Sequence, residues 1–215
     1  MNPFPAPSNQ MNPARSLQAE YISSVLFATI GSRVFPCVAA KSVMNRSEVS
    51  VGVYPDMAAA DGTSNLCFDF FEAATRDKVF AAVFLDNAIT SEKLFHDYIW
   101  RQLDLIACAS AALFAWDPSV SEDRDDPHYS FSFAGKAYFV VGMSPFSQRI
   151  SRRFPWPALV FNPRSRLDAL RANGTFDTIR DMIRTRDTAL DGSENPLLSD
   201  HGETSEAPQY SGFIE

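Results

Sequence analysis

The amino-acid sequence predicts an α+β fold, a single domain in which a largely antiparallel or mixed sheet is packed with helices. Two observations lead to this prediction. Apolar residues recur at helical spacing in several segments, and short apolar or alternating runs lie between them. The runs 130–133 and 137–141 flank a Gly135-Lys136 turn, which predicts a hairpin, and hairpins interspersed with helices are typical of α+β proteins. The length of 215 residues fits one domain.

In the first half of the chain, helix ends can be located from single residues. Gly31 is expected to cap the end of the first helix, and Thr90 or Ser91 the start of a later one. The run 34–40 is short, apolar and interrupted by a proline, so it is expected to be a turn that leads into a buried strand. Further helices are expected at 17–31, 66–74 and from 91 toward 116, and strands at 49–53 and 79–85, the latter covered on both faces.

In the second half, the acidic stretch 117–127 contains prolines and is expected to be a surface loop. A strand at 158–161 follows the hairpin. Two helices come next, and they are expected to end at Asn173-Gly174 and at Gly192. The domain organisation that results is a flexible N-terminal tail at 1–12 and a domain at 13–215.

The charge and cysteine content exclude several classes of protein. A net charge of -7 and a pI near 5.0 argue against a nucleic-acid partner, because such surfaces are usually basic. No apolar run reaches the ~20 residues that span a bilayer, and no signal peptide is apparent, so no membrane partner is expected. Three widely separated cysteines without a CxxC pair favour a reducing compartment. The protein is therefore expected to be cytoplasmic.

Common motifs for redox and hydrolytic chemistry are missing from the sequence. There is no GxGxxG after a strand, no P-loop, no HExxH and no GxSxG. Only three histidines are present, and paired carboxylate-histidine ligand motifs are scarce. A flavin or di-iron oxygenase is therefore disfavoured.

A set of motifs extends over most of the chain after the N-terminal tail, and its order and spacing resemble those of the YqcI/YcgG family. The resemblance is specific because many unrelated residue types agree at once. The motifs are Phe35-Pro-Cys37, Trp116-Asp-Pro118, Ser130-Phe-Ser-Phe133, Val140-Val-Gly-Met-Ser-Pro145, Ser147-Gln-Arg149, Arg152-Arg-Phe154, Pro157-Ala-Leu-Val-Phe-Asn162, Arg186-Asp187, Gly192, Asn195-Pro196 and Ser205-Glu-Ala-Pro-Gln-Tyr-Ser-Gly212.

This resemblance implies haem-dependent N-hydroxylation of a guanidine-bearing small molecule, as in arginine N-hydroxylases and the pre-guanitoxin N-hydroxylase. It implies an oxidoreductase that binds haem b non-covalently, with oxygen and an external electron donor, or peroxide, as further requirements. Cys37 is the expected iron ligand, since a thiolate can hold haem iron and favours O–O cleavage. Without the resemblance, a lone cysteine is more often a small buried hydrophobe.

The sequence departs from the family pattern at Ser144, where the family has histidine in Gly-Leu-His-Pro. A serine hydroxyl cannot replace imidazole as a strong haem ligand. Three outcomes stay open: the Cys37 thiolate holds the iron alone, His128 or Met143 substitutes, or no haem is bound. The alternative function is therefore a non-catalytic family member that carries or senses haem, or has lost it.

Charged residues in the motifs are the other candidates for the site. Arg149, Arg152 and Arg153 are expected to clamp haem propionates or a substrate carboxylate, although they can equally pair with the acidic loop. Glu206 is the expected acceptor of a cationic guanidine, and Tyr210 a hydrogen-bond partner of substrate or oxygen. The alternatives are that Glu206 or Asp187 belongs to an internal ion pair and that the C-terminal segment packs as a lid. Gln209 is a further candidate partner of substrate. His128 and His201 are expected to face solvent.

Overall fold

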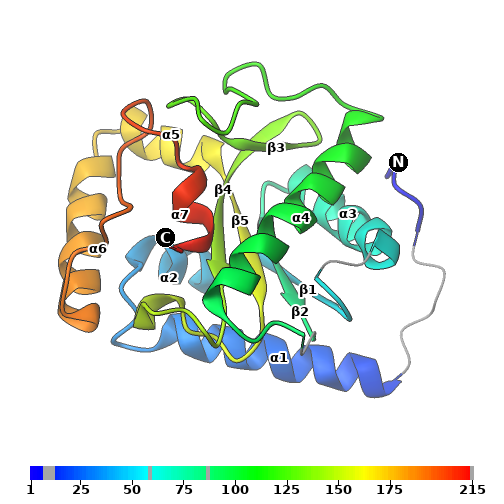
Figure 1. Cartoon of the computed structure of the whole chain (residues 1–215), viewed down its shortest axis with the longest axis horizontal. Coiled ribbons are helices and arrows are strands. Elements are labelled where there is room, and N and C mark those ends of the chain that lie inside the picture. Colours follow the sequence, from blue (N-terminus) through cyan, green and yellow to red (C-terminus); the bar gives the residue numbers. More distant parts are fainter. Residues whose placement is uncertain (7–12, 58–59, 86–87, 214–215) are drawn as a thin grey trace.

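The computed structural model describes residues 1–6, 13–57, 60–85 and 88–213 (Figure 1). Helices and strands are mixed along the chain, as the sequence predicts. The elements are α1 (Pro13–Gly31), α2 (Val38–Asn45), β1 (Val49–Tyr54), α3 (Ala60–Thr75), β2 (Val79–Phe84), α4 (Glu92–Ala111), β3 (Phe131–Phe133), β4 (Lys136–Met143), the 3-10 helix η1 (Ile150–Arg152), β5 (Ala158–Pro163), α5 (Arg164–Ala172), α6 (Phe176–Asp191) and α7 (Ala207–Ser211).

The five strands form one mixed sheet in the order β1-β2-β5-β4-β3. β1 and β2 are parallel and are connected through α3, while β5 runs antiparallel to both of its neighbours, β2 and β4. β3 and β4 form the expected hairpin, which turns at Ala134 and Gly135, both in left-handed backbone conformations. The α+β fold with a mixed sheet is thus confirmed.

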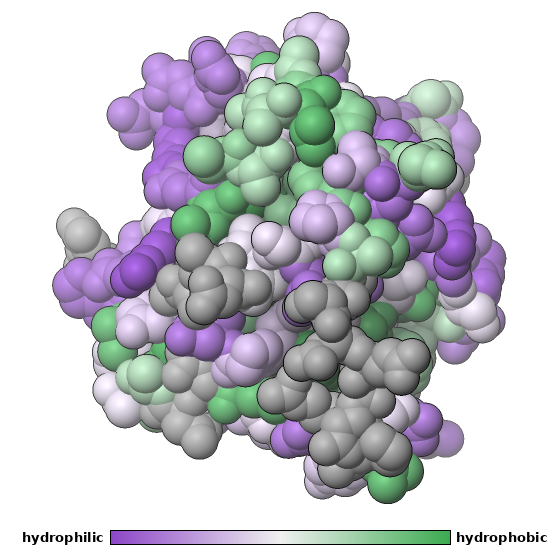
Figure 2. All heavy atoms as spheres, turned by 90° about the vertical axis from the view of Figure 1, so that its right-hand side faces the viewer, coloured by the Kyte–Doolittle hydropathy of each residue, from purple (hydrophilic) through white to green (hydrophobic). Residues whose placement is uncertain are grey.

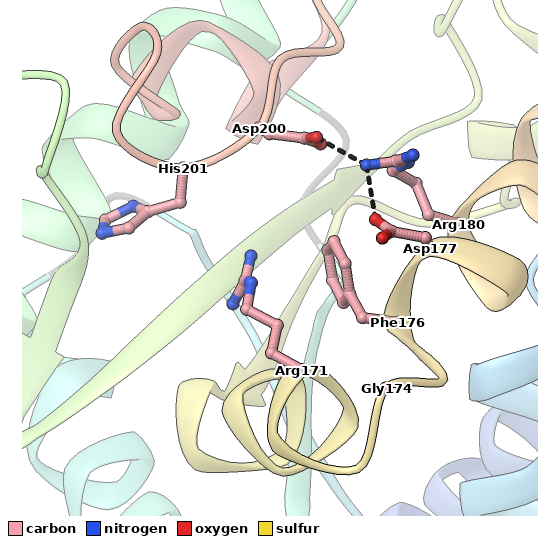
Figure 3. Close-up of a pocket in the computed structure, with 7 residues that line it drawn as sticks. All are labelled: Arg171, Gly174, Phe176, Asp177, Arg180, Asp200 and His201. Carbon is pink, nitrogen blue, oxygen red and sulfur yellow. Dashed lines mark hydrogen bonds and ion pairs between the residues drawn. The ribbon is translucent and has the colours of Figure 1, made fainter.

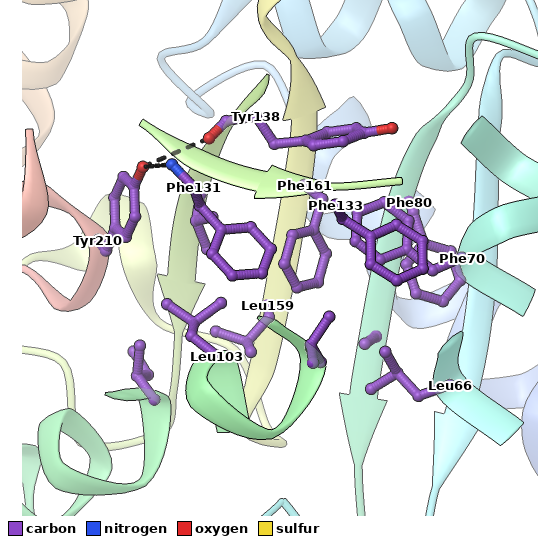
Figure 4. Packing of buried hydrophobic residues seen from close by; sticks show 14 of the residues in the cluster. Leu66, Phe70, Phe80, Leu103, Phe131, Phe133, Tyr138, Leu159, Phe161 and Tyr210 are labelled. Atoms are coloured by element: carbon purple, nitrogen blue, oxygen red, sulfur yellow. Dashed lines mark hydrogen bonds between the residues drawn. The ribbon is translucent and has the colours of Figure 1, made fainter. Parts of the chain in front are cut away.

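Two apolar clusters cover the two faces of the sheet. Every residue of β2 is buried, as expected for a strand covered on both sides, and its residues alternate between the clusters. Phe80 belongs to a cluster with α3 and α4, in which the rings of Phe70 and Phe133 stack with centroids 4.2 Å apart (Figure 4). Ala81 belongs to the second cluster, together with Ile22 of α1. These packed faces hold the sheet rigidly between helices.

Most helices begin and end where the sequence indicates. The side chain of Ser91 accepts a hydrogen bond from the backbone N–H of Leu94 and so caps α4. Gly192 adopts a left-handed conformation at the end of α6. The acidic stretch 117–127 is a loop of turns and bends, as expected. The N-terminal tail is described only in part: Phe4 is buried against Phe133, and residues 7–12 lie outside the described residues.

The prediction for residues 34–40 is wrong in one respect, since no strand follows the turn. Cys37 caps α2, which begins at Val38, and the Cys37 sulfur accepts a hydrogen bond from the Ala40 N–H at 3.3 Å. A short apolar run fits a helix as well as a strand, and the run is too short for periodicity to distinguish them. The short helix α7 was also not predicted.

The side of the molecule that lies to the right in Figure 1 carries apolar side chains on its surface. Figure 2 shows them gathered in the upper part of that side, at the height of the C-terminal end of α4 in Figure 1. Leu113, just after α4, is half exposed, whereas Ile99 and Leu103 in the middle of the helix are fully buried. The core-facing stripe of α4 therefore covers the sheet, and the chain reaches the surface just after the end of the helix.

Candidate functional site

The candidate residues from the sequence lie in two neighbouring groups, one around α6 and η1 and one around α7. The first group contains Cys37, Arg149 and Arg153, and the second contains Glu206 and Tyr210. Arg152 connects them, because it belongs to η1 and its Nη1 donates a hydrogen bond to the backbone oxygen of Tyr210 at 3.1 Å.

Cys37 combines a partly buried sulfur with the N-terminus of a helix. Burial raises the pKa of the Cys37 thiol, while backbone N–H groups of Ala40 and Ala39 and the charge of Lys41 lower it. The first effect is the largest, so the thiol is protonated at neutral pH unless a metal or another cation replaces the proton. Cys37 is thus not a free reactive thiolate.

Arg149 is held by carboxylates of α6. Its Nη2 lies 2.6 Å from an oxygen of Asp187 and 3.5 Å from one of Asp191, and it also donates to the backbone oxygen of Ser193. The Nε of Arg149 is buried and has no hydrogen-bond partner, and the same holds for Arg186 on α6. Asp187 is therefore an internal ion-pair partner, and two guanidinium donors beside it are left without acceptors.

Arg152 is a buried cation without a carboxylate partner within 4.0 Å among the described residues. Burial lowers its pKa to about 10. Arg153 is engaged differently, since it donates to the backbone oxygens of Ser147 and Gln148 and stabilises the loop after β4. Compared with Arg153, Arg152 is the residue whose buried charge a nearby anion would stabilise more.

Ser144 lies in this loop and is fully buried. Its Oγ accepts a hydrogen bond from the backbone N–H of Phe146 at 3.1 Å and lies 3.3 Å from the Oγ of Ser147. Its backbone bonds to Arg152 and Phe154. The serine is thus part of the loop structure, and its hydroxyl is used within it.

Glu206 and Tyr210 belong to a buried network that joins α7 to the sheet. Glu206 lies 3.0 Å from Nη1 of Arg164 and accepts hydrogen bonds from the Ser130 hydroxyl at 2.5 Å and the Tyr210 hydroxyl at 2.7 Å. The Tyr210 oxygen in turn accepts the backbone N–H of Phe131 at 2.9 Å (Figure 4). Arg164 and Glu206 are both buried, so this is an internal ion pair with its hydrogen bonds completed by neighbours.

The titration of this network follows from its burial. Burial raises the pKa of Glu206, and Ser130, Tyr210 and Arg164 oppose the rise. Burial and the nearby Glu206 carboxylate raise the pKa of Tyr210 well above its usual value. Tyr210 is therefore a neutral donor, and Ser130, Tyr210 and Arg164 already use three of the roughly four acceptor positions of the Glu206 carboxylate.

A pocket of about 290 Å³ opens next to this network, between the α5–α6 connection and residues 200 and 201. Figure 3 shows the side chains that line it, with Arg171 beside Phe176. The guanidinium of Arg171 lies 4.2 Å from the centre of the Phe176 ring. The lining residues are Arg171, Gly174, Phe176, Asp177, Arg180, Asp200 and His201.

His201 connects the pocket with the buried network. Its Nδ1 is buried, has no hydrogen-bond partner and lies 3.8 Å from Glu206, and its side chain is 20% exposed. Burial, together with nearby positive groups that include Arg164 and Arg171, lowers the pKa of His201 to about 4. Its ring packs edge-on against His128, whose side chain is 66% exposed. The expectation of solvent-facing histidines therefore holds for His128 and not for His201.

The contacts that several residues of these groups make were not predicted from the sequence. Arg164 and Ser130 complete the Glu206 network, and Arg171 and Phe176 line the pocket. Arg164 and Ser130 were visible only as a charge in a basic stretch and as a motif residue, because their pairing depends on contacts between distant segments. No group of three or more His, Cys, Asp or Glu side chains in the described part of the chain is arranged to hold a metal ion.

The two pockets described for this structure both lie away from Cys37, which lines neither of them. The second pocket is about 70 Å³ and is lined by residues at the end of α4 and by Trp116. Helices long and apolar enough to cross a membrane are absent from the described residues.

Comparisons with known proteins agree with the motifs. A protein of Bacillus subtilis (strain 168), named uncharacterized protein YqcI, is 30% identical over 112 residues. The aligned region is 47% of this chain and 43% of that relative, so the chain matches less than half of the relative's length. No solved structure matches the chain significantly. The family model described as the YqcI/YcgG family matches residues 26–214, and the chain therefore belongs to the YqcI/YcgG family.

Proposed function

We propose that this protein is a haem-dependent monooxygenase that hydroxylates a guanidine nitrogen of a small molecule, such as arginine or a derivative. The observation that carries the proposal is Cys37, a partly buried cysteine that caps α2 within a chain belonging to the YqcI/YcgG family. The resemblance to haem-dependent N-hydroxylases supplies the reaction, and Cys37 supplies a ligand of the required chemistry.

The side chains that would hold haem in this proposal are Cys37 and two arginines. Cys37 would hold the iron, and the backbone N–H groups that face its sulfur favour the thiolate form. Arg152, together with the partnerless Nε of Arg149, offers donors for carboxylates such as the two propionates. Haem supplies the redox centre at which oxygen is activated, which amino-acid side chains do not provide.

The overall change converts a guanidine N–H into N–OH. One oxygen atom of O₂ enters the substrate and the other leaves as water, with two electrons and two protons from an external donor. With hydrogen peroxide as oxidant, one oxygen atom enters the substrate, water leaves, and no added electrons are needed. The protein would therefore work with a separate reductase or with peroxide.

The geometry favours a positioning role for Glu206 and Tyr210. Glu206 is already matched by Arg164, so it orients Ser130 and Tyr210 rather than receiving the guanidinium directly. The backbone oxygen of Tyr210 accepts a hydrogen bond from Arg152 and so links α7 to η1. Substitution of either residue is thus expected to act on the site through the position of η1.

Ser144 is the observation that favours a second function, a family member without hydroxylase activity. The buried serine stands where the family pattern has histidine, and its hydroxyl bonds within its own loop. In this second proposal, the protein carries or senses haem, or binds none. For either function we propose a cytoplasmic location, because a reducing compartment keeps Cys37, Cys67 and Cys108 free, as they are in the structure.

The test is the absorption spectrum of the full chain, titrated with haem. We expect a Soret band with thiolate character in the wild type and its loss in Cys37→Ser, which retains an oxygen able to cap α2. Cys108→Ser is the matched control, because Cys108 is exposed, and it is expected to leave the band unchanged.

Each other outcome rejects part of the proposal. Absence of a Soret band in the wild type would reject haem binding and the hydroxylase with it. A band that is unchanged in Cys37→Ser would reject Cys37 as the ligand. Haem binding without hydroxylation of any guanidine compound, when a reductant with O₂ or peroxide is supplied, would support the carrier or sensor instead.

A further inference from the structure

The side chains that line the pocket between α5 and α6 differ in how far their charges are already matched. Arg180 is bound by three carboxylates, at 2.9 Å from Asp177, 2.9 Å from Asp181 and 2.6 Å from Asp200. Asp200 also lies 3.2 Å from Arg184. Figure 3 shows Arg180 between Asp177 and Asp200 on one side of the pocket. These charged groups neutralise one another, so they line one side of the pocket without offering an unpaired charge to a ligand.

On the other side of the pocket, Arg171 and His201 are not matched in this way. Arg171 has a single carboxylate partner, Asp168, at 3.0 Å, and both side chains are exposed by a third or more. Exposed pairs of this kind contribute little to stability, so a ligand can compete for the guanidinium. Nδ1 of His201 is buried, has no hydrogen-bond partner among the described residues and lies 3.8 Å from the Glu206 carboxylate. The Arg171 guanidinium is therefore the donor of the pocket whose charge is least matched, and His201 lines the pocket beside it.

We propose that this pocket binds a small molecule through an anionic group, a phosphate or a carboxylate, that is held by Arg171 and His201. A guanidinium can bind either group through two parallel hydrogen bonds. The Phe176 ring, which already packs against the Arg171 guanidinium, fixes the plane in which those bonds are offered. This proposal is independent of haem binding and of Cys37.

The electrostatic surroundings of His201 include three positive groups that a bound anion would oppose. Burial is the largest cause that lowers the pKa of His201 to about 4, and the charges of Arg164, His128 and Arg171 lower it further. On the negative side, Asp168 raises the pKa and the Glu206 carboxylate lies 3.8 Å from Nδ1. A bound anion opposes the three positive charges and raises the pKa again.

The beginning of α6 adds further donors to the same pocket. Gly174, Phe176 and Asp177 line the pocket at the start of this 16-residue helix. The first N–H groups of a helix have no partner within it, and Thr175 makes no side-chain hydrogen bond to them. Helix N-termini favour anions for this reason.

The volume of the pocket limits the size of the ligand. Pockets for drug-sized ligands measure about 300–1,000 Å³. At about 290 Å³, this pocket lies at the lower end of that range. The ligand is therefore a metabolite-sized molecule rather than a nucleotide cofactor or a peptide.

The experiment measures the binding of inorganic phosphate and, separately, of acetate to the full chain at low ionic strength. Histidine side-chain NMR follows the pKa of His201, whose signal is assigned with His201→Gln. We expect the pKa to rise from about 4 in the presence of the preferred anion. The anion that binds more tightly identifies phosphate or carboxylate as the recognised group.

Two substitutions separate a specific site from a general effect of charge. Arg171→Gln is expected to weaken binding about tenfold, because a charge-assisted hydrogen bond is lost. Arg101→Gln removes the same charge from an exposed position on α4 and is expected to leave binding unchanged. Equal weakening in both variants, or no change in the His201 pKa with either anion, would overturn the proposal.

Discussion

Two buried arginines contact the segment around α7, and they differ in what matches their charge. Arg164 is paired with Glu206 and shares the Ser130 hydroxyl with it. Arg152 donates to the backbone oxygen of Tyr210, with no carboxylate within 4.0 Å among the described residues. Arg164 thus belongs to a buried ion pair with completed hydrogen bonds, whereas the charge of Arg152 is opposed only by carboxylates farther away, first of all Asp187.

The largest effect is expected from Arg164→Met. It leaves the Glu206 carboxylate buried without its cation, which costs about 3–5 kcal/mol of the free energy of unfolding. Chemical denaturation measures this difference. The control is Arg166→Met on the same helix, since Arg166 pairs with Glu48 near the surface and its loss is expected to cost roughly 0–1 kcal/mol.

A double substitution sharpens the first prediction. If the cost in Arg164→Met arises from an unmatched charge, then replacement of Glu206 by Met as well should recover most of it. A double variant as unstable as the single one would show instead that packing around α7, rather than charge, governs the loss.

A smaller effect on stability is expected from Arg152→Met. No carboxylate is left behind, and only the Tyr210 backbone oxygen loses a donor, so the free energy of unfolding should fall by about 1 kcal/mol. If Arg152 anchors a haem propionate, the same variant should weaken haem binding by about tenfold. A loss of stability as large as that of Arg164→Met would remove the distinction between the two arginines.

The last prediction concerns the dependence of stability on pH. The pKa of His201 is about 4 in the folded chain and 6.5 in the unfolded chain, so the unfolded state binds more protons between these values. The contribution of His201 is therefore fully present above pH 6.5 and is lost as the pH falls toward 4. The free energy of unfolding, measured from denaturation curves at several pH values in this window, should therefore change less steeply with pH in His201→Gln than in the wild type.

His128→Gln serves as the comparison for this measurement. The side chain of His128 is 66% exposed. Its replacement is therefore expected to leave the slope of the free energy of unfolding against pH as in the wild type. An identical slope in the wild type and in His201→Gln would contradict the burial of the His201 imidazole.

Most helices and strands could be predicted from the sequence, because they satisfy a local periodicity. β2 has six buried residues in a row, and α4 carries a stripe with Phe95 and Ile99 four residues apart. Residues 34–40 could not be assigned, since an apolar run of this length fits either kind of element. α7 has only five residues, and its position depends on Glu206 and Tyr210 rather than on helix propensity.

The candidate site was predictable only as far as motifs extend. The motif residues Arg152 and Glu206 both make contacts in the interior, but the sequence does not show that Glu206 pairs with Arg164, 42 residues away. The pocket depends on a contact between Arg180 and Asp200, 20 residues apart in the chain. Contacts between distant segments follow from the packing of the whole domain, and composition and spacing do not reveal them.

The hydroxyl of Tyr210 contacts the backbone N–H of Phe131, which was synthesised 79 residues earlier. During translation, Arg164 and Ser130 are therefore made before the glutamate and tyrosine that complete their hydrogen bonds. A nascent chain that has reached only α6 has its sheet strands but lacks the partners of a buried cation. Completion of the interior thus has to wait for residues 206–210, which makes the arrival of α7 a late step in folding on the ribosome.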